Sequence, residues 1–370
     1  MNQGIPSSKR EGAQTLHAKV RHLGRVTNPS QARIVGGRYR VLKRAGEGLT
    51  ARVYFAEDMQ TRHRVVVKQL TVEAASDTAL ATRFMHEVHA VAAINHPNVV
   101  RILDYGAPAY EQPFLVMEAL PGETLSQLLK RETTLEFDLA LFLSRQAALG
   151  LCAVHRTGTV HRDIKPDNLF LVGPLGNPTG LKIIDFGMAQ LPDSRHAIGD
   201  GRFVVGTLQY MPPEQVLADP VDARADVYSL GIVMFRLFTG HLPFEVDAGL
   251  DMLGHQLLSP LPPIGWLYET VDPRLESIIV RATRKRPLNR YQTMAAFLRD
   301  IETLGDVPLE AMNATTGRPT EPDEYLPVSA RAQEIANGLA LRFRHTPKPP
   351  PPDPEEAPES TKPFDLARKR

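Results

Sequence analysis

Two hydrophobic patterns follow one another along this chain, and their order is the feature that most constrains the fold. The first third holds short apolar runs separated by turn residues, which are typical of strands. From Leu125 onward the apolar residues recur mostly at helical spacing. The sequence therefore predicts an α+β fold in which a small antiparallel β lobe with one main helix precedes a larger, mostly helical lobe. Ligand sites favour the seam between two such units.

The expected elements follow from these two periodicities. The expected strands are Tyr39–Val41, Arg52–Phe55, Arg64–Gln69, Val99–Asp104 and Phe114–Met117, with a later hairpin of Leu169–Val172 and Leu181–Ile184. The expected helices are Thr82–Ile94, Leu125–Lys130, Phe137–His155, Asp226–Thr239, Leu275–Thr283 and Thr293–Thr303. The first helix is predicted to turn its apolar face inward through Phe84, Val88, Val91 and Ile94.

A change of composition separates the periodic part of the chain from two tails. Residues 306–370 contain twelve of the 31 prolines, which favours an extended linker over regular structure. We expect a basic, unstructured tail at 1–37, one domain at 38–304 divided into lobes 38–120 and 121–304, and a proline-rich tail at 305–370. Within that tail, apolar residues at helical spacing predict a short amphipathic helix over 328–343. Packing of this helix on the main domain is favoured over a partner-binding or autoregulatory role.

Charge and cysteine content narrow the function classes. Lys+Arg 43 against Asp+Glu 42 gives a formal charge of +1, which argues against nucleic-acid binding by bulk positive charge. The single cysteine, Cys152, excludes an intramolecular disulfide and favours a reducing compartment. The longest apolar stretch, Val227–Thr239, contains Arg236 and is shorter than the roughly 20 residues of a membrane span. The sequence therefore predicts a soluble, cytoplasmic protein.

A glycine-rich run, Gly46–Val53, lies between two strand patterns. A hairpin turn is the plain interpretation, and the alternative is a flap whose backbone approaches phosphates closely. The dinucleotide fingerprint is disfavoured because no helix follows the glycines. Lys68 ends the next apolar strand, and Glu87 lies on the following expected helix. These two side chains are predicted to pair and to direct the ammonium group at anionic oxygens.

The polar segment His161–Asn168 carries most of the chemical information. It contains Asp163 and Asn168, and a short hairpin separates it from Asp185. The Asn168 amide and the Asp185 carboxylate are oxygen ligands suited to Mg²⁺ holding phosphates. Asp163 is a separate carboxylate that can accept a hydroxyl proton or orient a nucleophile. Phosphoryl transfer requires this combination of charge neutralisation and positioning.

These motifs, in this order, resemble the protein kinase superfamily, and most closely its bacterial serine/threonine members. The resemblance covers about residues 38 to 304 and implies a two-lobe protein kinase fold. It rests on His161–Asn168, Asp185-Phe186-Gly187, Asn95–Val100, Gly206-Thr207 and Pro213-Glu214-Gln215. Lys165, two residues after Asp163, resembles the serine/threonine pattern. Arg290 is expected to form a buried structural pair with Glu214.

The resemblance also implies individual site roles. Asp163 would be the catalytic base, and Lys68 would hold the α- and β-phosphates. The catalytic residues would be Asp163, Lys165, Lys68 and Asn168. The ATP-binding residues would be Ala45, Gly46, Glu47, Gly48, Val53, Val66, Lys68, Glu87, Met117, Glu118 and Leu120. The metal ligands would be Asn168 and Asp185 for Mg²⁺, with Mn²⁺ as an alternative, and the activation segment would contain Ser194 and Thr207.

Three departures from the family pattern bear on activity. Ala51 replaces the third loop glycine, and Val66 stands where a smaller alanine usually lies above adenine. Ser194 is the only hydroxyl residue between Gly187 and Gly206. Activation would therefore use Ser194 or Thr207, or no phosphate. We expect Thr207 mainly to line the surface that binds the acceptor protein and to help orient Asp163 and Lys165.

Three functions remain in competition on the sequence alone. The leading one is an ATP-dependent protein serine/threonine kinase in intracellular signalling, with protein substrates that present serine or threonine. The first alternative is a catalytically weak pseudokinase that acts as a nucleotide-binding scaffold. The second is a small-molecule kinase, against which the Gly206-Thr207 and Pro213-Glu214 segments argue. The proline-rich tail is a candidate partner-binding region, and no nucleic acid or membrane span is expected.

Overall fold

The computed structural model describes residues 33–48, 50–107, 112–186, 208–244, 249–266 and 272–305. Contacts divide the chain into a unit of residues 1–326 and a unit of residues 327–370. Every described residue belongs to the first unit. The unstructured tail predicted for 1–37 is described only from residue 33, and there the prediction is wrong, because Ile34–Val35 forms a strand that pairs with Tyr39 and Arg40. The rest of that tail, Ser194, Thr207 and the 328–343 helix lie outside the described residues.

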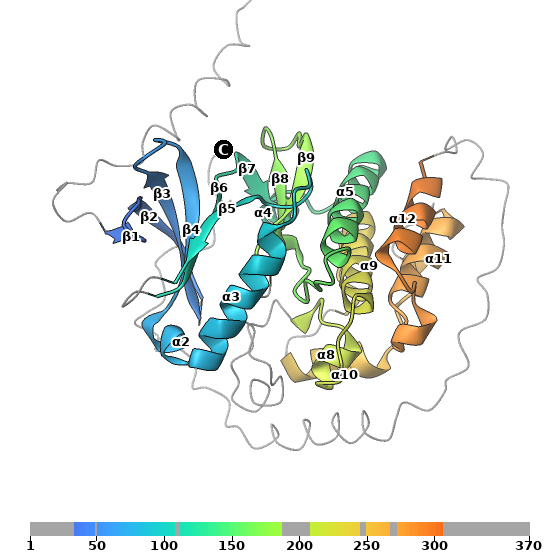
Figure 1. The fold of residues 1–370 in the computed structure, drawn as a ribbon. Helices are drawn as coiled ribbons and strands as arrows, with labels where there is room; N and C mark the ends of the chain where they lie inside the picture. The colour runs from blue at the N-terminus through green and yellow to red at the C-terminus, as the bar shows by residue number, and fades with distance from the viewer. Residues whose placement is uncertain are drawn as a thin grey trace, which may run out of the picture. The chain divides into compact units, whose positions relative to one another are not determined.

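The described part contains the strand-rich and helix-rich halves in the expected order (Figure 1). The strands are β1 (Ile34–Val35), β2 (Tyr39–Glu47), β3 (Ala51–Asp58), β4 (Arg64–Leu70), β5 (Ile102–Gly106), β6 (Phe114–Glu118), β7 (Gly122–Thr124), β8 (Leu169–Val172) and β9 (Gly180–Ile183). The α-helices are α2 (Val72–Ser76), α3 (Thr78–Ala92), α4 (Leu125–Arg131), α5 (Phe137–His155), α8 (Pro213–Val216), α9 (Arg224–Thr239), α10 (Gly249–Leu258), α11 (Pro273–Ala282) and α12 (Met294–Thr303). Short 3₁₀ turns are η2 (Pro166–Asn168), η3 (Ile264–Trp266) and η4 (Pro287–Asn289).

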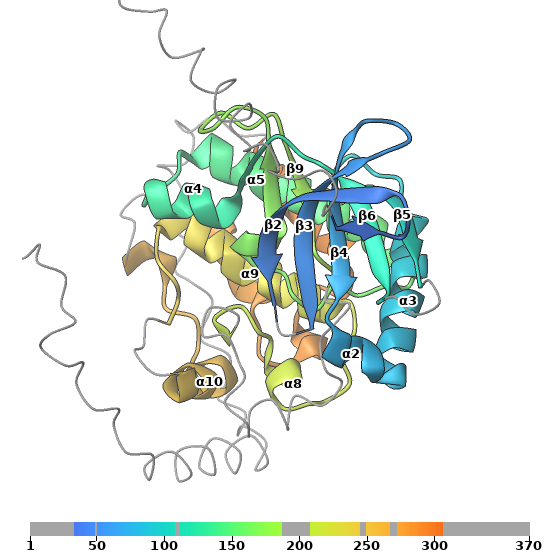
Figure 2. The ribbon, with the colours of Figure 1, turned by 90° about the vertical axis from the view of Figure 1, so that its left-hand side faces the viewer.

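The first lobe is an antiparallel sheet with the strand order β1-β2-β3-β4-β6-β5. Figure 2 shows these strands side by side, with α3 next to β5. Alternation along the strands divides the side chains between two faces. Val65 and Val67 of β4 pack with Ala56 of β3 and Val116 of β6 in a small apolar cluster. Because Val66 and Lys68 alternate with them, these two side chains are directed to the other face.

Helix α3 starts earlier than its apolar spacing predicted. Asp77 caps it by accepting the N–H groups of Ala79 at 3.0 Å and Leu80 at 3.1 Å. A short helix, α2, precedes it and was missed, because five residues are too few to display a helical period. Its N-cap is Thr71, which accepts the N–H of Ala74 at 3.2 Å. The predicted inward residues of α3 are buried, as is Ile94 beyond its end.

The strand predicted at Val99–Asp104 begins three residues later, at Ile102. Val99 instead forms an isolated parallel bridge with Ile183 of β9. The N–H of Val100 donates to the Ile183 carbonyl at 2.9 Å, and the N–H of Ile183 donates to the Asn98 carbonyl at 2.8 Å. This segment therefore ties the first lobe to the second, a long-range pairing that local propensity does not reveal.

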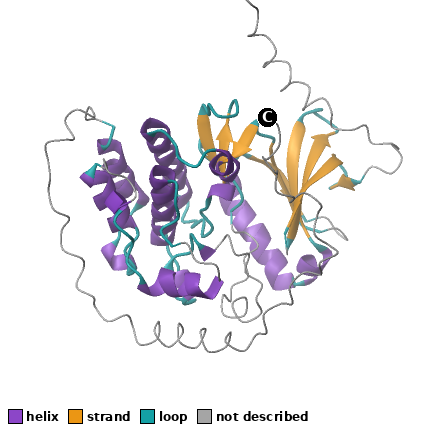
Figure 3. Cartoon of the chain, turned by 180° about the vertical axis from the view of Figure 1, so that it is seen from behind, coloured by secondary structure: helices purple, strands orange, loops and turns teal. Residues whose placement is uncertain are grey.

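The second lobe is built around α5, whose bounds match the prediction. Helix α5 contacts β9, α9 and α12. Figure 3 shows these helices grouped apart from the six-stranded sheet. Gly150 allows α5 to lie close to Asn98 and to β9, because a Cβ atom there would lie 2.7 Å from the Asn98 carbonyl oxygen and from Ile183 Cδ1. Among the described residues, α5 is also the one helix long and apolar enough to cross a membrane, although 56% of that window is buried in the fold.

Candidate active site

Asp226, in the first turn of α9, holds the segment His161–Asn168, which is called the catalytic loop below because it carries the predicted base. Its carboxylate accepts the backbone N–H groups of His161 and Arg162, both at 2.8 Å. It also contacts Nε2 of His155 at 2.7 Å. Asp226 is fully buried. Burial opposes its ionisation, but these partners outweigh burial and hold the pKa of Asp226 below its usual value.

Two residues of the site adopt a left-handed backbone conformation. Arg162 has φ of 66° and Asp185 has φ of 54°. Such values are uncommon for residues other than glycine and cost free energy. The two hydrogen bonds to Asp226 hold Arg162 in this conformation. The adjoining Phe186 packs against His161, with ring centroids 4.9 Å apart.

Asp163, the predicted base, lies between two donors on its own segment. Lys165 Nζ donates to its two carboxylate oxygens at 3.0 and 2.9 Å. Asn168 Nδ2 donates to Asp163 Oδ2 at 2.9 Å and to its backbone carbonyl at 2.7 Å. Burial raises the pKa of the Asp163 carboxyl, and Lys165 reduces that rise. The arrangement orients a carboxylate that is a stronger proton acceptor than an exposed aspartate.

Asn168 and Asp185, the predicted metal ligands, come from adjacent backbone segments. The N–H of Ile184 donates to the Asn168 carbonyl at 2.9 Å. The amide nitrogen of Asn168 is used by Asp163, so its amide oxygen is the group left to coordinate a cation. The Asp185 side chain is 45% exposed. This donor set of a neutral oxygen and a carboxylate fits a hard divalent cation.

Lys68 pairs with a different residue from the predicted Glu87. Its ammonium group pairs with Asp185, whereas Glu87 accepts from Arg83, one turn earlier in α3, at 3.2 Å. The predicted Lys68–Glu87 pair is therefore not formed in this structure. The physical reason is that each charge is taken by another partner of opposite sign, Asp185 for Lys68 and Arg83 for Glu87. Burial opposes ionisation of Asp185, but Lys68 outweighs it and holds the pKa of Asp185 below its usual value.

The nucleotide side of the predicted site is formed by the sheet and the segment after β6. Val66 is paired in register with Met117, and Lys68 with Leu115. Met117 and Leu120 pack against the main core. The glycine-rich turn joins β2 to β3, as the hairpin interpretation requires, and is held by ion pairs of Glu47. Of the predicted ATP-binding residues in this region, Ala45, Gly46 and Glu47 lie in β2, Gly48 follows β2, and Val53 lies in β3.

Glu118 is anchored more firmly than the sequence suggested. Its carboxylate accepts from Lys182 Nζ of β9 at 2.7 Å and from the N–H of Arg101 at 2.8 Å. Its own N–H donates to the Arg101 carbonyl at 3.1 Å. The link between the lobes therefore carries a charged contact to β9, which belongs to a second, three-stranded sheet with the order β7-β8-β9. Lys182 was not singled out from the sequence, because a lysine on a short hairpin carries no distinctive pattern.

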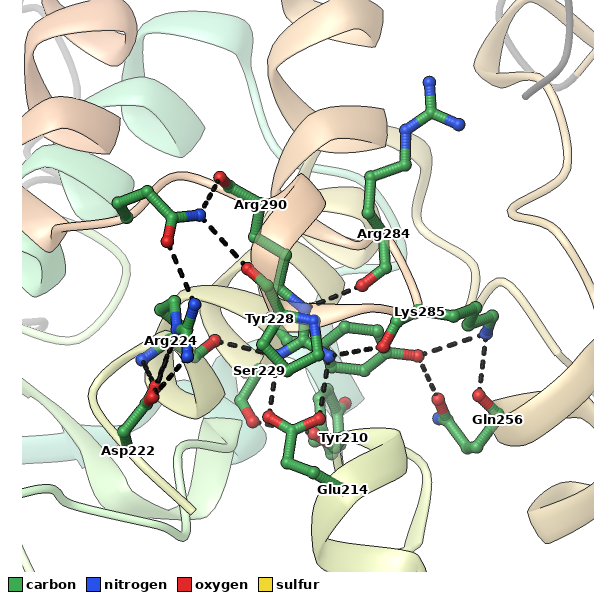
Figure 4. A network of polar contacts seen from close by, with 12 residues as sticks. Tyr210, Glu214, Asp222, Arg224, Tyr228, Ser229, Gln256, Arg284, Lys285 and Arg290 are labelled. Carbon is green, nitrogen blue, oxygen red and sulfur yellow. Dashed lines mark hydrogen bonds and ion pairs between the residues drawn. The ribbon is translucent and has the colours of Figure 1, made fainter. Parts of the chain in front are cut away.

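The predicted Glu214–Arg290 pair is confirmed and belongs to a larger polar network (Figure 4). Both guanidinium NH₂ groups of Arg290 donate to the Glu214 carboxylate at 2.7 Å. The network also contains Tyr228, together with Lys285 and Gln256, two residues that sequence reasoning missed. Gln256 Nε2 donates to the Gln209 carbonyl at 2.6 Å, two residues after Thr207.

A cavity of about 390 Å³ lies elsewhere, on α11, α12 and the segment between them. Its lining includes Ile278 and Tyr291, and it shares no residue with the site described above. The chemistry of the site, rather than this cavity, therefore locates the functional centre.

Comparison with known proteins shows the family of this chain. The protein kinase domain family matches residues 39–296. Serine/threonine-protein kinase Pkn1 of Myxococcus xanthus is 37% identical over 323 residues, covering 82% of this chain and 46% of that protein. Serine/threonine-protein kinase PknB of Mycobacterium tuberculosis is 34% identical over 281 residues, covering 75% and 44%. The chain thus spans about half the length of these curated relatives.

A solved structure shows the same fold. The crystal structure of the Mycobacterium tuberculosis PknI kinase domain matches with a TM-score of 0.57 at 23% identity, covering 73% of this chain and 97% of that one. A second crystal structure of the same kinase domain matches with a TM-score of 0.58 at 23% identity, covering 74% of this chain and 98% of that one. At this identity the likeness concerns the fold alone.

Proposed function

Because the chain belongs to the protein kinase family, we propose that it is an ATP-dependent protein serine/threonine kinase. It transfers the γ-phosphoryl group of ATP to serine or threonine hydroxyls of a protein substrate. The curated relatives named serine/threonine-protein kinase support this activity. The observation that carries the proposal is the meeting of Lys68, Asp163, Asn168 and Asp185 at one place, although they come from three separate parts of the sequence.

The side chains have separable roles. Lys68 binds the phosphates, and Asn168 with Asp185 would hold Mg²⁺, which neutralises phosphate charge when bound. Asp163 orients the acceptor hydroxyl and accepts its proton at a carboxylate oxygen. Lys165, which donates to both Asp163 oxygens, keeps that carboxylate in place and adds positive charge beside the transferred group.

Lys68 has to exchange partners for this role. When Asp185 binds a cation, the cation replaces the ammonium group of Lys68 as the counter-charge of Asp185. Lys68 is then free to pair with Glu87 of α3. We propose that the Lys68–Asp185 contact is the resting arrangement and that nucleotide with Mg²⁺ favours the Lys68–Glu87 pair. The 45% exposure of the Asp185 side chain supports such an exchange.

The test is transfer of radiolabelled phosphate from ATP to a generic protein acceptor. Wild type should transfer phosphate, Asp163→Asn should lose about 10²–10⁴-fold in rate, and Lys68→Met should lose transfer as well. Nucleotide binding by wild type without transfer would instead establish the pseudokinase. Calorimetric titration with nucleotide, with and without Mg²⁺, makes that distinction, and retained unfolding temperatures in both variants exclude misfolding.

The activation segment belongs to the same proposal. We expect Thr207 to line the surface that binds the acceptor protein. Where activation uses a phosphate, we expect Ser194 to be the residue that carries it. Mass spectrometry after incubation with MgATP checks this. Heavy phosphorylation of Thr207 in an active enzyme would contradict the acceptor role.

Location and partners are proposed from composition. The single cysteine and the use of ATP favour the cytoplasm. The proline-rich tail is proposed to bind partner proteins. Affinity purification of the full chain, compared with a chain lacking 306–370, tests the tail, and an identical set of co-purifying proteins would refute its role.

A further inference from the structure

Helix α9 carries one partly exposed charged residue, Arg236, within a long buried stretch. Every residue from Ala225 to Thr239 is buried except Arg236, which is partly exposed. The only other charged residue in that stretch is Asp226, whose contacts with the catalytic loop account for it. Arg236 lies in the last turn of α9, where the helix dipole favours a cation. That preference does not select a particular partner, so the contacts of its guanidinium group require their own explanation.

The guanidinium group of Arg236 has one neutral partner. Its Nη1 donates to the hydroxyl of Tyr210 at 2.6 Å. Among the described residues, no carboxylate lies within 4.0 Å of it. By comparison, the guanidinium of the buried Arg290 is paired with the Glu214 carboxylate. A partly buried charge without a counterion is unfavourable, and an anionic ligand would relieve that cost.

Arg236 lies beside the segment expected to receive the acceptor protein. Tyr210 follows Thr207 by three residues, and its carbonyl accepts from Ser229 Oγ of α9 at 2.8 Å. Burial raises the pKa of Tyr210, Arg236 opposes this rise, and the carboxylate of Asp167 adds to it. Asp167 belongs to η2, directly after Lys165 and Pro166. Ser229, which donates to Tyr210, lies three residues after Asp226 on α9, so the helix that holds the catalytic loop also carries the Arg236–Tyr210 pair.

The length of α9 gives the approximate distance between Arg236 and the catalytic loop. Arg236 follows Asp226, which carries the catalytic loop, by ten residues, or roughly 15 Å of helix. An extended peptide covers that length in about five residues. The long arginine side chain shortens the required reach. An anionic side chain within about five residues of the acceptor hydroxyl can therefore meet this guanidinium.

We propose that Arg236 is a specificity-determining residue that binds a carboxylate on the acceptor protein, within about five residues of the phosphorylated serine or threonine. The proposal rests on the proposed kinase function and extends it to a substrate class, namely acidic acceptor sequences. Arginine suits this role because its planar guanidinium binds a carboxylate through two parallel hydrogen bonds. A phosphorylated side chain presents similar oxygens and would bind by the same chemistry.

The experiment compares peptides that differ only in charge near the acceptor. A serine peptide is made in neutral, acidic and basic versions by placing Gln, Glu or Lys at the same position, scanned over five residues on each side. A fourth version carries phosphoserine. We expect wild type to prefer the best acidic peptide over its neutral counterpart about tenfold in kcat/KM, chiefly through KM.

The variants separate recognition from structure. Arg236→Lys keeps the charge and should retain most of the preference, Arg236→Gln should abolish it, and Arg236→Glu should reverse it in favour of the basic peptide. The readout is the ratio of acidic to neutral kcat/KM within each variant, which a general loss of stability leaves unchanged. An equal ratio in wild type and Arg236→Gln overturns the proposal and leaves arginine as a side chain that merely reaches water.

A binding measurement keeps this test independent of catalysis. Fluorescence anisotropy of the same labelled peptides reports the affinity of each variant even where no phosphate is transferred. Loss of transfer with charge-selective binding refutes the kinase proposal but supports the role of Arg236. Transfer without charge selectivity has the opposite meaning. A preference that appears only after the enzyme phosphorylates itself assigns Arg236 to a phosphate on its own chain and overturns acceptor recognition.

Discussion

The two ends of the catalytic machinery are held in contrasting ways. At the nucleotide side, Lys68 contacts Asp185, and Glu87 contacts Arg83, each by a single ion pair at a partly exposed carboxylate. At the α8–α9 side, the side chains of Arg290 and Glu214 are 0% and 7% exposed. The charges that we propose to exchange partners thus form single, partly exposed ion pairs, whereas the Glu214–Arg290 pair is enclosed.

The enclosed side owes its rigidity to complete satisfaction of its donors. Besides Glu214, Arg290 donates to the carbonyls of Arg284 at 2.6 Å, Arg224 at 3.0 Å and Lys285 at 2.9 Å. A buried ion pair contributes little net stability by itself, but removing one partner leaves an uncompensated charge. The cost of breaking the pair should therefore far exceed the cost of breaking a surface pair.

The largest expected effect is on the Glu214–Arg290 pair. Glu214→Gln should lower the free energy of unfolding by about 3–5 kcal/mol, because the Arg290 charge stays buried without its counterion. Arg145→Met is the matched control, because Arg145 and Glu302 form a pair at 3.6 Å with 47% and 43% exposure. Its cost should be below about 1 kcal/mol. Equal costs in urea unfolding would contradict the contrast between the two sides.

A smaller effect is expected at Asp226, a buried carboxylate of α9 that also holds the catalytic loop. Asp226→Asn should lower the free energy of unfolding by about 1–3 kcal/mol, because an amide cannot accept all the donors that now face the carboxylate. It should also reduce phosphate transfer by displacing the catalytic loop. Since the pKa of Asp226 is lowered by folding, the wild-type advantage should persist at neutral pH and disappear as pH falls through that lowered pKa. An advantage that is constant down to pH 2 would exclude this linkage.

Lys285 offers a pH test of the enclosed side. Burial lowers its pKa to about 7 from its ordinary value of 10.5. The unfolded chain therefore binds one more proton than the folded protein between these values, and stability should rise with pH across that window. Relative to Lys285→Met, wild type should gain at most about 1.4 kcal/mol per pH unit between pH 7 and 10. Parallel stability curves for the two proteins would show that the ammonium remains charged, held by the carbonyls of His255 and Gln256.

The same contrast explains what the sequence could predict. Helix α5 matched its predicted bounds because its apolar period is long and uninterrupted. The fold class, the Glu214–Arg290 pair and the grouping of Asp163 with Asn168 followed from residue identities in family order. In each of these cases the sequence pattern is compatible with one structural arrangement, so the prediction agrees with the structure.

Other features depend on competition or on long-range contacts. Lys68 can pair with either of two carboxylates, and the sequence holds nothing that ranks them. Lys182, Gln256 and Lys285 act through backbone carbonyls and neighbouring side chains whose positions only the fold determines. The pairing of Val99 with Ile183 is likewise a tertiary contact that strand propensity cannot place.

The smallest expected effect lies at the exchangeable side and would sharpen the comparison most. Arg83 competes with Lys68 for Glu87, and side-chain pairs four residues apart on a helix contribute about 0.2–0.5 kcal/mol. Arg83→Gln should therefore release Glu87 and lower the KM for ATP about twofold, without a change in the free energy of unfolding beyond that amount. Arg83→Lys, which keeps the competing charge, is the control. Because Glu87→Gln removes the carboxylate for which both cations compete, adding Arg83→Gln to it should change nothing, and a twofold change in that background would show that Arg83 acts by another route.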